Sequence, residues 1–255
     1  MHVSIEEAGE GVSVVLLHGL TATRRYVVHG SRALERGGHR VVAYDARGHG
    51  RSAPQDDYGY EALATDLATV LSDRGIESAV LAGASMGAHT IAAFALRAPQ
   101  RVRAAVLITP AFDPEGEPSF ASWDARAHGL RSGGIEGFLE ASRPFSSPPR
   151  WHDTIERVIR QRLGEHESLD AVADALEQVP RSRPFEAWAD LASLQVPVTI
   201  VASSDDADPV HPFAVAERYA AALPDGRLVT EEPGQSPLAW QGGQLSRVIA
   251  EAAHA

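Results

Sequence analysis

The 255-residue sequence contains no cysteine and no lysine. Without cysteine it can form no disulfide, no thiolate metal site and no cysteine nucleophile, which fits a reducing compartment. Without lysine it has no Schiff-base chemistry, no anchor for pyridoxal phosphate, no Ser–Lys dyad and no P-loop lysine. Several classes of covalent and cofactor chemistry are therefore excluded before any motif is considered.

Long hydrophobic runs and an excess of positive charge are also missing. No apolar run approaches the roughly 18 residues of a membrane span, and the acidic stretch MHVSIEEAGEG has no apolar segment of signal-peptide length. The formal net charge of -11 argues against nucleic acid and against anionic membrane surfaces as partners. We expect a soluble, cytoplasmic protein whose partner is a small-molecule substrate or ligand.

Short apolar runs rich in β-branched residues alternate with segments of helical spacing along most of the chain. The expected strands lie near 13–18, 39–44, 78–83, 103–109, 197–203 and 226–232, and the expected helices within 59–75, 86–99, 212–226 and 242–255. Such alternation predicts an α/β fold, with a mostly parallel sheet covered by helices on both faces.

The stretch 113–186 breaks this alternation. It contains clusters of proline and glycine and arginine-rich amphipathic segments, and no convincing strand. We expect a helical cap insertion in a core formed by 1–112 and 187–255. In the functional interpretation the cap is a lid over the mouth of a pocket.

The sequence GASMG, residues 83–87, places a serine between two glycines, after an apolar run and before a helical segment. A serine in this setting lies on a sharp, strained turn that bulky neighbours would obstruct. The turn lifts the hydroxyl to the carboxyl end of the strands, beside backbone N–H groups at a helix N-terminus. Ser85 is therefore the candidate nucleophile.

Two further motifs support this interpretation, namely VVLLHGL at 14–20 and VVAYDARGHGRS at 41–52. Together with the serine turn they stand in the order typical of the α/β-hydrolase superfamily. The chain resembles that family over nearly its whole length, and the cap is the least matched part. The resemblance implies an α/β-hydrolase fold and a serine hydrolase activity.

The resemblance also implies roles for single residues. Ser85 matches the nucleophile, and the backbone N–H groups of Leu20 and Met86 match the oxyanion hole. His18 and His49 match positions that usually shape loops by hydrogen bonding. The family acid usually follows the strand after the cap, where Asp208 stands.

Other acids remain candidates. Asp205 and Asp206 are neighbours of Asp208, and Asp113 stands at an alternative acid position used by some relatives. A metal cluster built from the three neighbouring acids is disfavoured by their spacing on one loop without histidine partners. We expect no metal and no cofactor.

The catalytic histidine of the family normally follows the last strand in a Gly-His-Ser-Pro turn. Here the turn reads PGQSP, with Gln235 at the histidine position. A neutral amide cannot accept the serine proton as an imidazole does. Loss of one triad member typically costs several orders of magnitude in rate.

Three accounts of this departure are open. A displaced base could act, either His211, three residues after Asp208, or His89, one helical turn past Ser85, whereas His128 and His152 in the cap are weaker candidates. The protein could instead be a degenerate hydrolase. The third account, an engineered or misaligned turn, gains nothing from a small shift in alignment because no other histidine lies between 226 and 252.

Two functions follow. The first is a serine hydrolase of a small ester or related acyl substrate, with an atypical or missing general base. The second is a non-catalytic protein of the same fold that binds a small apolar or acyl ligand. The intact serine turn favours the first, because its strain has no other evident purpose, and Gln235 favours the second.

Overall fold

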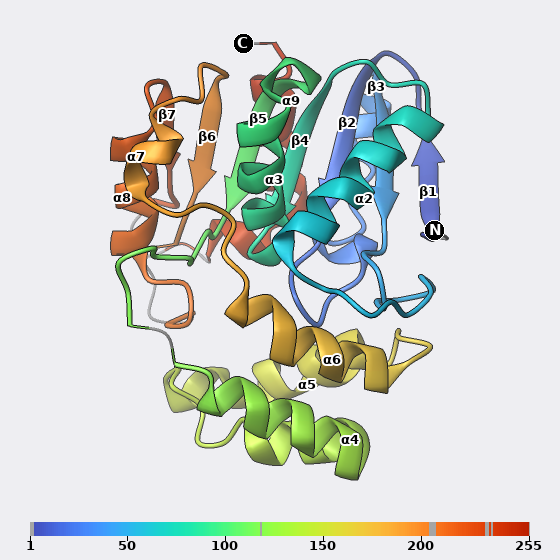
Figure 1. The fold of residues 1–255 in the computed structure, drawn as a ribbon, viewed down its shortest axis with the longest axis vertical. Coiled ribbons are helices and arrows are strands. Elements are labelled where there is room, and N and C mark those ends of the chain that lie inside the picture. Colours follow the sequence, from blue (N-terminus) through green and yellow to red (C-terminus); the bar gives the residue numbers. More distant parts are fainter. Residues whose placement is uncertain (1–2, 118, 204–207, 233–234, 236, 255) are drawn as a thin grey trace.

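Seven strands form one twisted sheet in the computed structural model, which describes residues 3–117, 119–203, 208–232, 235 and 237–254 (Figure 1). The strand order is β1-β3-β2-β4-β5-β6-β7, and every neighbouring pair is parallel except β1 with β3. The strands are β1 (Ile5–Ala8), β2 (Val12–Leu17), β3 (His39–Tyr44), β4 (Ala79–Ala84), β5 (Val102–Ile108), β6 (Val198–Val201) and β7 (Gly226–Val229). The predicted α/β-hydrolase fold class is confirmed.

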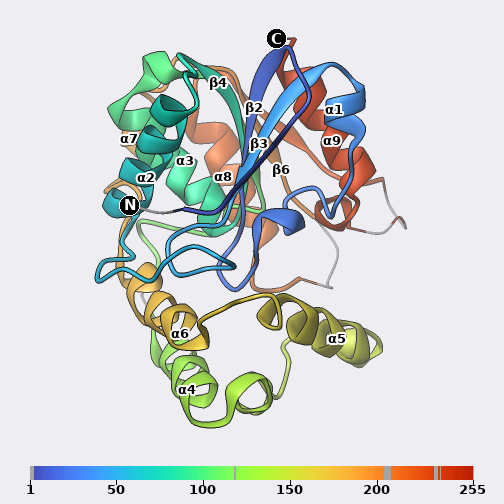
Figure 2. The same ribbon diagram turned by 90° about the vertical axis from the view of Figure 1, so that its right-hand side faces the viewer.

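Helices cover both faces of the sheet because its central strands are apolar on both sides (Figures 1 and 2). Along β2, Val15 and Leu17 belong to one hydrophobic cluster, and Val14 and Leu16 belong to the cluster on the opposite face. The first face carries α2 (Tyr60–Asp73), α3 (Met86–Arg97), α7 (Trp188–Leu191) and α8 (Phe213–Ala222), and the second carries α1 (Ala33–Arg36) and α9 (Gly242–Ala252).

One strand lies outside the sequence prediction. The first strand, β1, reads IEEA and pairs antiparallel with β3 at the edge of the sheet. Its two central residues are glutamates and both are exposed. Because β1 has no apolar run of the kind that marks a buried parallel strand, its sequence does not predict a strand.

The topology brings two loops together at the carboxyl edge of the sheet. The chain passes from β2 to β3 on one side of β2, whereas β4 lies on its other side. Ligands of open α/β sheets bind at such a switch point, outside the carboxyl ends of the strands. The His-Gly-Leu loop follows β2 and the serine turn follows β4, so both motifs meet there.

The stretch between β5 and α7 is helical and covers this carboxyl edge (Figures 1 and 2). It contains α4 (Ala121–Ala141), which has a non-helical residue at Gly134, together with α5 (His152–Leu163) and α6 (Leu169–Gln178). These helices share a small apolar cluster of their own, against which Leu20 of the core packs. In the rest of this article "cap" means these three helices and their connections.

The cap is tied to the core by the loop between α5 and α6. The N–H of Gly50 donates to Nδ1 of His166 at 2.8 Å, and the N–H of Glu167 donates back to the carbonyl of Gly50 at 2.9 Å. The hydroxyl of Thr23 donates to Oε2 of Glu165 at 2.6 Å. These bonds fix the cap loop beside the segment that continues from the His-Gly-Leu loop.

Five short 3₁₀ helices complete the secondary structure of the described residues: η1 (Arg24–Tyr26), η2 (Pro99–Arg101), η3 (Pro149–Trp151), η4 (Val179–Arg181) and η5 (Leu238–Trp240). Within the described ranges, no helix combines the length and the apolar character needed to cross a membrane.

The close approach of α3 to the end of β2 gives the first prediction. A Cβ atom added at Gly87 would lie 2.2 Å from the carbonyl oxygen of Leu17, so the backbone would have to move. We expect Gly87→Ala to lower the free energy of unfolding by about 2 kcal/mol or more, measured by urea denaturation.

The matched control for this variant is Gly133→Ala in α4. A Cβ atom at Gly133 would meet nothing within 4 Å, so this variant should unfold at the midpoint of the parent or slightly above it, because alanine also restricts the unfolded chain. Equal midpoints for Gly87→Ala and the parent would contradict the steric argument.

Candidate active site

Ser85 lies at the turn between β4 and α3 in a strained backbone conformation. Its φ is 49° and its ψ is -110°, a combination of the kind that costs roughly 1–3 kcal/mol and persists only when the surroundings impose it. Backbone bonds impose it here: the N–H of Ser85 donates to the carbonyl of Ile108 at 2.9 Å, and its carbonyl accepts from the N–H of His89 at 3.0 Å.

The hydroxyl of Ser85 is hydrogen-bonded to a histidine from another loop. Nε2 of His211 lies 3.0 Å from Oγ of Ser85, and Nδ1 of His211 lies 2.8 Å from Oδ2 of Asp208. An ionised carboxylate can only accept, so Nδ1 of the neutral ring carries the hydrogen and Nε2 is free to accept from the serine. The three side chains form one chain of hydrogen bonds.

A single β-turn supplies both the histidine and the aspartate. The N–H of His211 donates to the carbonyl of Asp208 at 3.2 Å, which closes a four-residue turn with Pro209 at its second position. Proline favours that position because its φ is already close to the required value. The turn keeps both side chains partly shielded, with 20% of the His211 side chain and 18% of the Asp208 side chain exposed.

Two backbone N–H groups lie next to the serine. Met86 begins α3, where the first N–H groups have no partner within the helix. The His-Gly-Leu loop lies against the turn, because a Cβ atom at Gly19 would lie 3.5 Å from Cβ of Ser85. Among the residues that the structure describes, neither the N–H of Leu20 nor that of Met86 has an acceptor.

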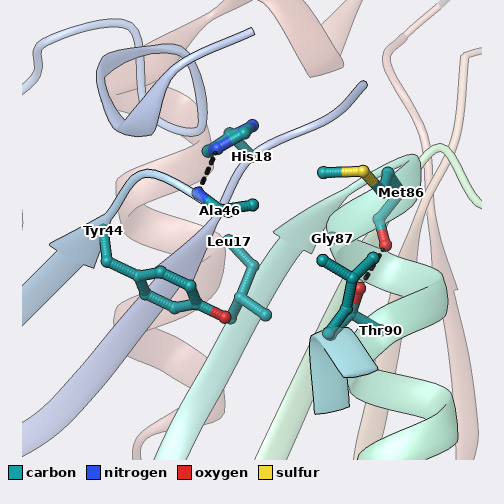
Figure 3. A pocket seen from close by; sticks show the side chains of 8 residues that line it. Leu17, His18, Tyr44, Ala46, Met86, Gly87 and Thr90 are labelled. Atoms are coloured by element: carbon teal, nitrogen blue, oxygen red, sulfur yellow. Dashed lines mark hydrogen bonds between the residues drawn. The ribbon is translucent and has the colours of Figure 1, made fainter. Parts of the chain in front are cut away.

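His18 and His49 shape the loops around the site. Nδ1 of His18 donates to the carbonyl of Gly19 at 2.8 Å, and its Nε2 accepts from the N–H of Ala46 at 2.8 Å (Figure 3). Burial lowers the pKa of His18 to about 4, so the ring stays neutral. The His49 ring lies 5.1 Å from it, centroid to centroid, and Nδ1 of His49 donates to the carbonyl of Arg47 at 2.9 Å.

A small cavity lies behind the serine turn (Figure 3). Its volume is about 10 Å³, which is the space of one water molecule at most. It is lined by Leu17, His18, Tyr44, Ala46, Leu63, Met86, Gly87 and Thr90. Its size excludes a substrate, so the cavity belongs to the packing that supports the turn.

His89 takes a structural position. Its Nε2 accepts from the N–H of Ala111 at 2.9 Å and from that of Phe112 at 3.1 Å, and its Nδ1 lies 2.9 Å from the hydroxyl of Tyr60. Both ring nitrogens are thus occupied away from Oγ of Ser85. Burial lowers the pKa of His89 to about 3, with a smaller effect of His211 in the same direction.

Gln235 does not lie at the serine. It is exposed, and its backbone N–H donates to the carbonyl of Glu232 at 3.0 Å. No side-chain hydrogen bond joins Gln235 to any of the described residues. The residue at the family histidine position after the last strand therefore makes no hydrogen bond with Ser85, whose Oγ is bonded to His211 instead.

The remaining sequence candidates lie elsewhere. Asp113 receives Nη1 of Arg218 at 3.2 Å. His128 is exposed on α4, and Nε2 of His152 lies 2.8 Å from the carbonyl of Ser147 in the cap. Asp205 and Asp206 are outside the described residues. No group of His, Asp or Glu within the described ranges could hold a metal ion.

His211 was one of several candidate bases, although the residues around it indicate a tight turn that joins it to Asp208. In DPVHP, residues 208–212, a proline follows the acid and the histidine stands at the fourth turn position. A side chain that the sequence analysis did not single out is Arg162, which stands on the same face of α5 as Ile155 and Ile159.

The fold agrees with the comparisons to known proteins. A family model described as "alpha/beta hydrolase fold" matches residues 12–242, and the chain belongs to this family. A relative from Variovorax paradoxus, which carries the name of a carbamate hydrolase, RutD, is 29% identical over 231 residues, or 89% of this chain and 86% of the relative. A non-heme chloroperoxidase of Kitasatospora aureofaciens is 26% identical over 97% of this chain and 93% of its own length.

Solved structures show the same fold. An esterase of Thermogutta terrifontis, with malate bound, has a TM-score of 0.79 at 23% identity and covers 98% of this chain and 92% of its own. An enol-lactonase of Burkholderia xenovorans has a TM-score of 0.77 at 21% identity and covers 99% of this chain and 96% of its own. At these identities the structural likeness establishes the fold alone.

The buried neutral ring of His89 makes stability depend on pH. Its pKa of about 3 in the folded protein lies below the ordinary value of 6.5, so the unfolded chain binds the proton more readily. The stabilisation is complete above pH 6.5 and is lost as the pH falls. Between pH 7.5 and 5 the His89 ring should lower the free energy of unfolding by about 2 kcal/mol.

The His89→Gln variant should show a smaller loss of stability over the same pH interval, measured by urea denaturation at pH 7.5 and 5. His128→Gln, which changes an exposed histidine, should keep the pH dependence of the parent. An unchanged pH dependence in His89→Gln would contradict the assignment of a buried neutral ring.

Proposed function

We propose that the protein is a serine hydrolase that acts on a small ester or related acyl substrate through Ser85, with His211 as general base and Asp208 as the residue that orients it. The observation that carries this proposal is the unbroken path of hydrogen bonds from Asp208 through His211 to Oγ of Ser85. The names of relatives, a carbamate hydrolase, an esterase and an enol-lactonase, support hydrolysis of an acyl bond in a small molecule.

In the proposed reaction, Oγ of Ser85 attacks the substrate carbonyl carbon while Nε2 of His211 takes the hydroxyl proton. The resulting imidazolium is stabilised by the carboxylate of Asp208, which accepts from Nδ1. His211 then gives the proton to the leaving group, and an acyl-enzyme remains on Ser85. A water molecule activated by the same nitrogen hydrolyses the acyl-enzyme and restores the hydroxyl.

The negative charge that develops on the carbonyl oxygen needs donors next to the serine. The N–H groups of Leu20 and Met86 are the proposed donors, since neither has an acceptor among the described residues and both adjoin the turn. Removing one such donor in other enzymes costs about 10²- to 10³-fold in rate. Because both proposed donors are backbone groups, side-chain substitution at these positions leaves the donors in place.

With His211 as the proposed base, Gln235 no longer argues against catalysis. In the sequence, Gln235 in place of a histidine favoured a binding protein, whereas the intact serine turn favoured a hydrolase. The proposed site has its histidine on the same turn as its acid, so Gln235 has no catalytic task in this mechanism.

The test compares hydrolysis of p-nitrophenyl acetate by the parent and by single variants. Ser85→Ala and His211→Ala should each lower kcat/KM by about 10³-fold or more, because each removes a member of a unit that acts together. Gln235→Ala should stay within about threefold of the parent, since its side chain is exposed.

Circular dichroism and thermal unfolding of each variant control for loss of fold. If Gln235→Ala lost activity while His211→Ala kept it, the base would be assigned wrongly. If the parent were no faster than Ser85→Ala, hydrolysis at this site would be disproved.

The orienting role of Asp208 has its own test. Asp208→Asn keeps the side-chain shape but offers an amide that can donate to Nδ1 of His211, which would favour the tautomer with its hydrogen on Nε2. We expect kcat to fall by about 10³- to 10⁴-fold with KM little changed. A loss of less than tenfold in a folded variant would argue that His211 acts without its aspartate.

A further inference from the structure

Three arginines of the cap are paired with carboxylates: Arg131 with Asp174 and Glu177, Arg143 with Glu156, and Arg160 with Glu136. Arg181, which follows the cap in η4, pairs with Asp124 of α4. Such pairs are partly exposed and explain how a cap rich in arginine keeps its charges balanced.

Arg162 in the last turn of α5 departs from this pattern. Its Nε is buried and has no hydrogen-bond partner. Across the described part of the chain, none of its guanidinium nitrogens forms an ion pair or a hydrogen bond. The guanidinium carbon instead lies 5.4 Å from the centroid of the Tyr26 ring, where it makes a cation–π contact.

A carboxylate close in sequence is already occupied. Glu165 stands three residues after Arg162, but its oxygens accept from the hydroxyl of Thr23 at 2.6 Å and from that of Tyr26 at 3.3 Å. Arg25 approaches the same carboxylate at 3.5 Å. The core loop thus holds Glu165, and Arg162 is left without an anion.

The position of Arg162 links the cap to the proposed catalytic groups. Tyr26, against which it stacks, ends the short helix that continues from the His-Gly-Leu loop. Its neighbour Leu163 belongs to the apolar cap cluster on which Leu20 packs. Burial lowers the pKa of the Arg162 guanidinium, and the negative charge of the Asp208 carboxylate acts in the opposite direction.

Arg162 does not form an ion pair with Asp208. Oδ2 of Asp208 lies 2.8 Å from Nδ1 of His211, and no nitrogen of Arg162 comes within 4 Å of a described carboxylate oxygen. Burying a guanidinium nitrogen without an acceptor costs folding free energy, and the planar fork of guanidinium donors matches the two oxygens of a carboxylate. Arg162 is therefore suited to bind a carboxylate that the described residues do not supply.

We propose that Arg162 binds a carboxylate carried by the substrate, on the acyl side of the bond that Ser85 cleaves. The inference rests on the proposed hydrolase function and adds a substrate class, the monoester or lactone of a dicarboxylic acid. A carboxylate suits the site better than a phosphate dianion, because the carboxylate of Glu165, which accepts from the hydroxyl of the same Tyr26, would repel a doubly charged group more strongly.

A second cap arginine helps to define what is special about Arg162. Arg126 on α4 also has a buried Nε without a partner and stacks on Trp123, with its guanidinium carbon 5.0 Å from the ring centroid. Trp123 belongs to the same cap helix as Arg126, whereas Tyr26, on which Arg162 stacks, belongs to the core segment that follows the His-Gly-Leu loop. The link to the catalytic groups is therefore found at Arg162.

The experiment uses the full chain and a pair of esters of matched length, mono-p-nitrophenyl glutarate and p-nitrophenyl pentanoate. The ratio of their kcat/KM values is the measured selectivity. We expect Arg162→Met to lower this ratio by about 10- to 100-fold, the range for a charged hydrogen bond, mainly through kcat/KM of the glutarate ester.

Two further variants separate binding from folding. Arg157→Met removes an exposed arginine from the same helix and should leave the ratio at the value of the parent. Arg162→Lys keeps the charge without the fork and should give an intermediate ratio. Arg162→Met should unfold within a few degrees of the parent, because it loses the stacking on Tyr26 but also removes a buried nitrogen without an acceptor.

Calorimetric titration of Ser85→Ala with monoethyl glutarate tests the anion site without catalysis. We expect a Kd that rises about tenfold or more when Arg162→Met is added and stays constant when Arg157→Met is added. Equal affinities, or no binding at millimolar concentration, would overturn the anion site even if esters are hydrolysed. Binding that depends on Arg162, without hydrolysis by the parent, would overturn the proposed hydrolase function and leave the anion site standing.

Discussion

The contact on which the structure depends is the approach of α3 to the end of β2. The backbone at Gly87 lies so close to the carbonyl of Leu17 that no side chain fits between them, and Gly83 leaves the matching space on β4 for the same turn. This contact presses the start of α3 against the His-Gly-Leu loop. As a result the Ser85 hydroxyl and the N–H groups beside it lie at one point on the carboxyl edge of the sheet, where the strand order reverses.

The proposed base reaches this point by a different path from the one that the family resemblance implies. The turn after the last strand keeps its glycine and prolines, but its Gln235 is exposed. The turn after β6 provides Asp208 and His211 together, closed by a backbone bond and by the bond between their side chains. An aspartate and a histidine on one turn move as a unit, so their mutual orientation depends on local geometry rather than on the packing of two separate loops. The loop after the last strand is then free to vary without loss of the proposed triad.

Electrostatics divide the buried titratable groups into two kinds. The rings of His18 and His89 are kept neutral by burial and accept hydrogen bonds from backbone N–H groups of neighbouring loops. They hold the loops around Ser85 in place. Arg162 is the contrasting case, because its Nε is buried without an acceptor and none of its nitrogens forms an ion pair with a described carboxylate. A neutral buried ring finds its hydrogen-bond partners within the protein. A buried cation is stabilised by an anion, which in our proposal is a carboxylate of the substrate.

The sequence by itself determined the fold class and pointed to Ser85 as the candidate nucleophile. Buried parallel strands read as continuous apolar runs, and a serine between two glycines is a local signal of a strand-to-helix turn. It could not reveal β1, whose edge position needs only a partner strand and no apolar run. The motif after the last strand pointed to Gln235 at the family's histidine position. His211 and His89 remained equal candidates for a displaced base. Only the tertiary structure decided between them, because it occupies both nitrogens of His89 with other partners and brings His211 to Ser85 across 126 residues of chain. The same holds for Arg162, whose missing partner is a property of the packed cap and not of its helix.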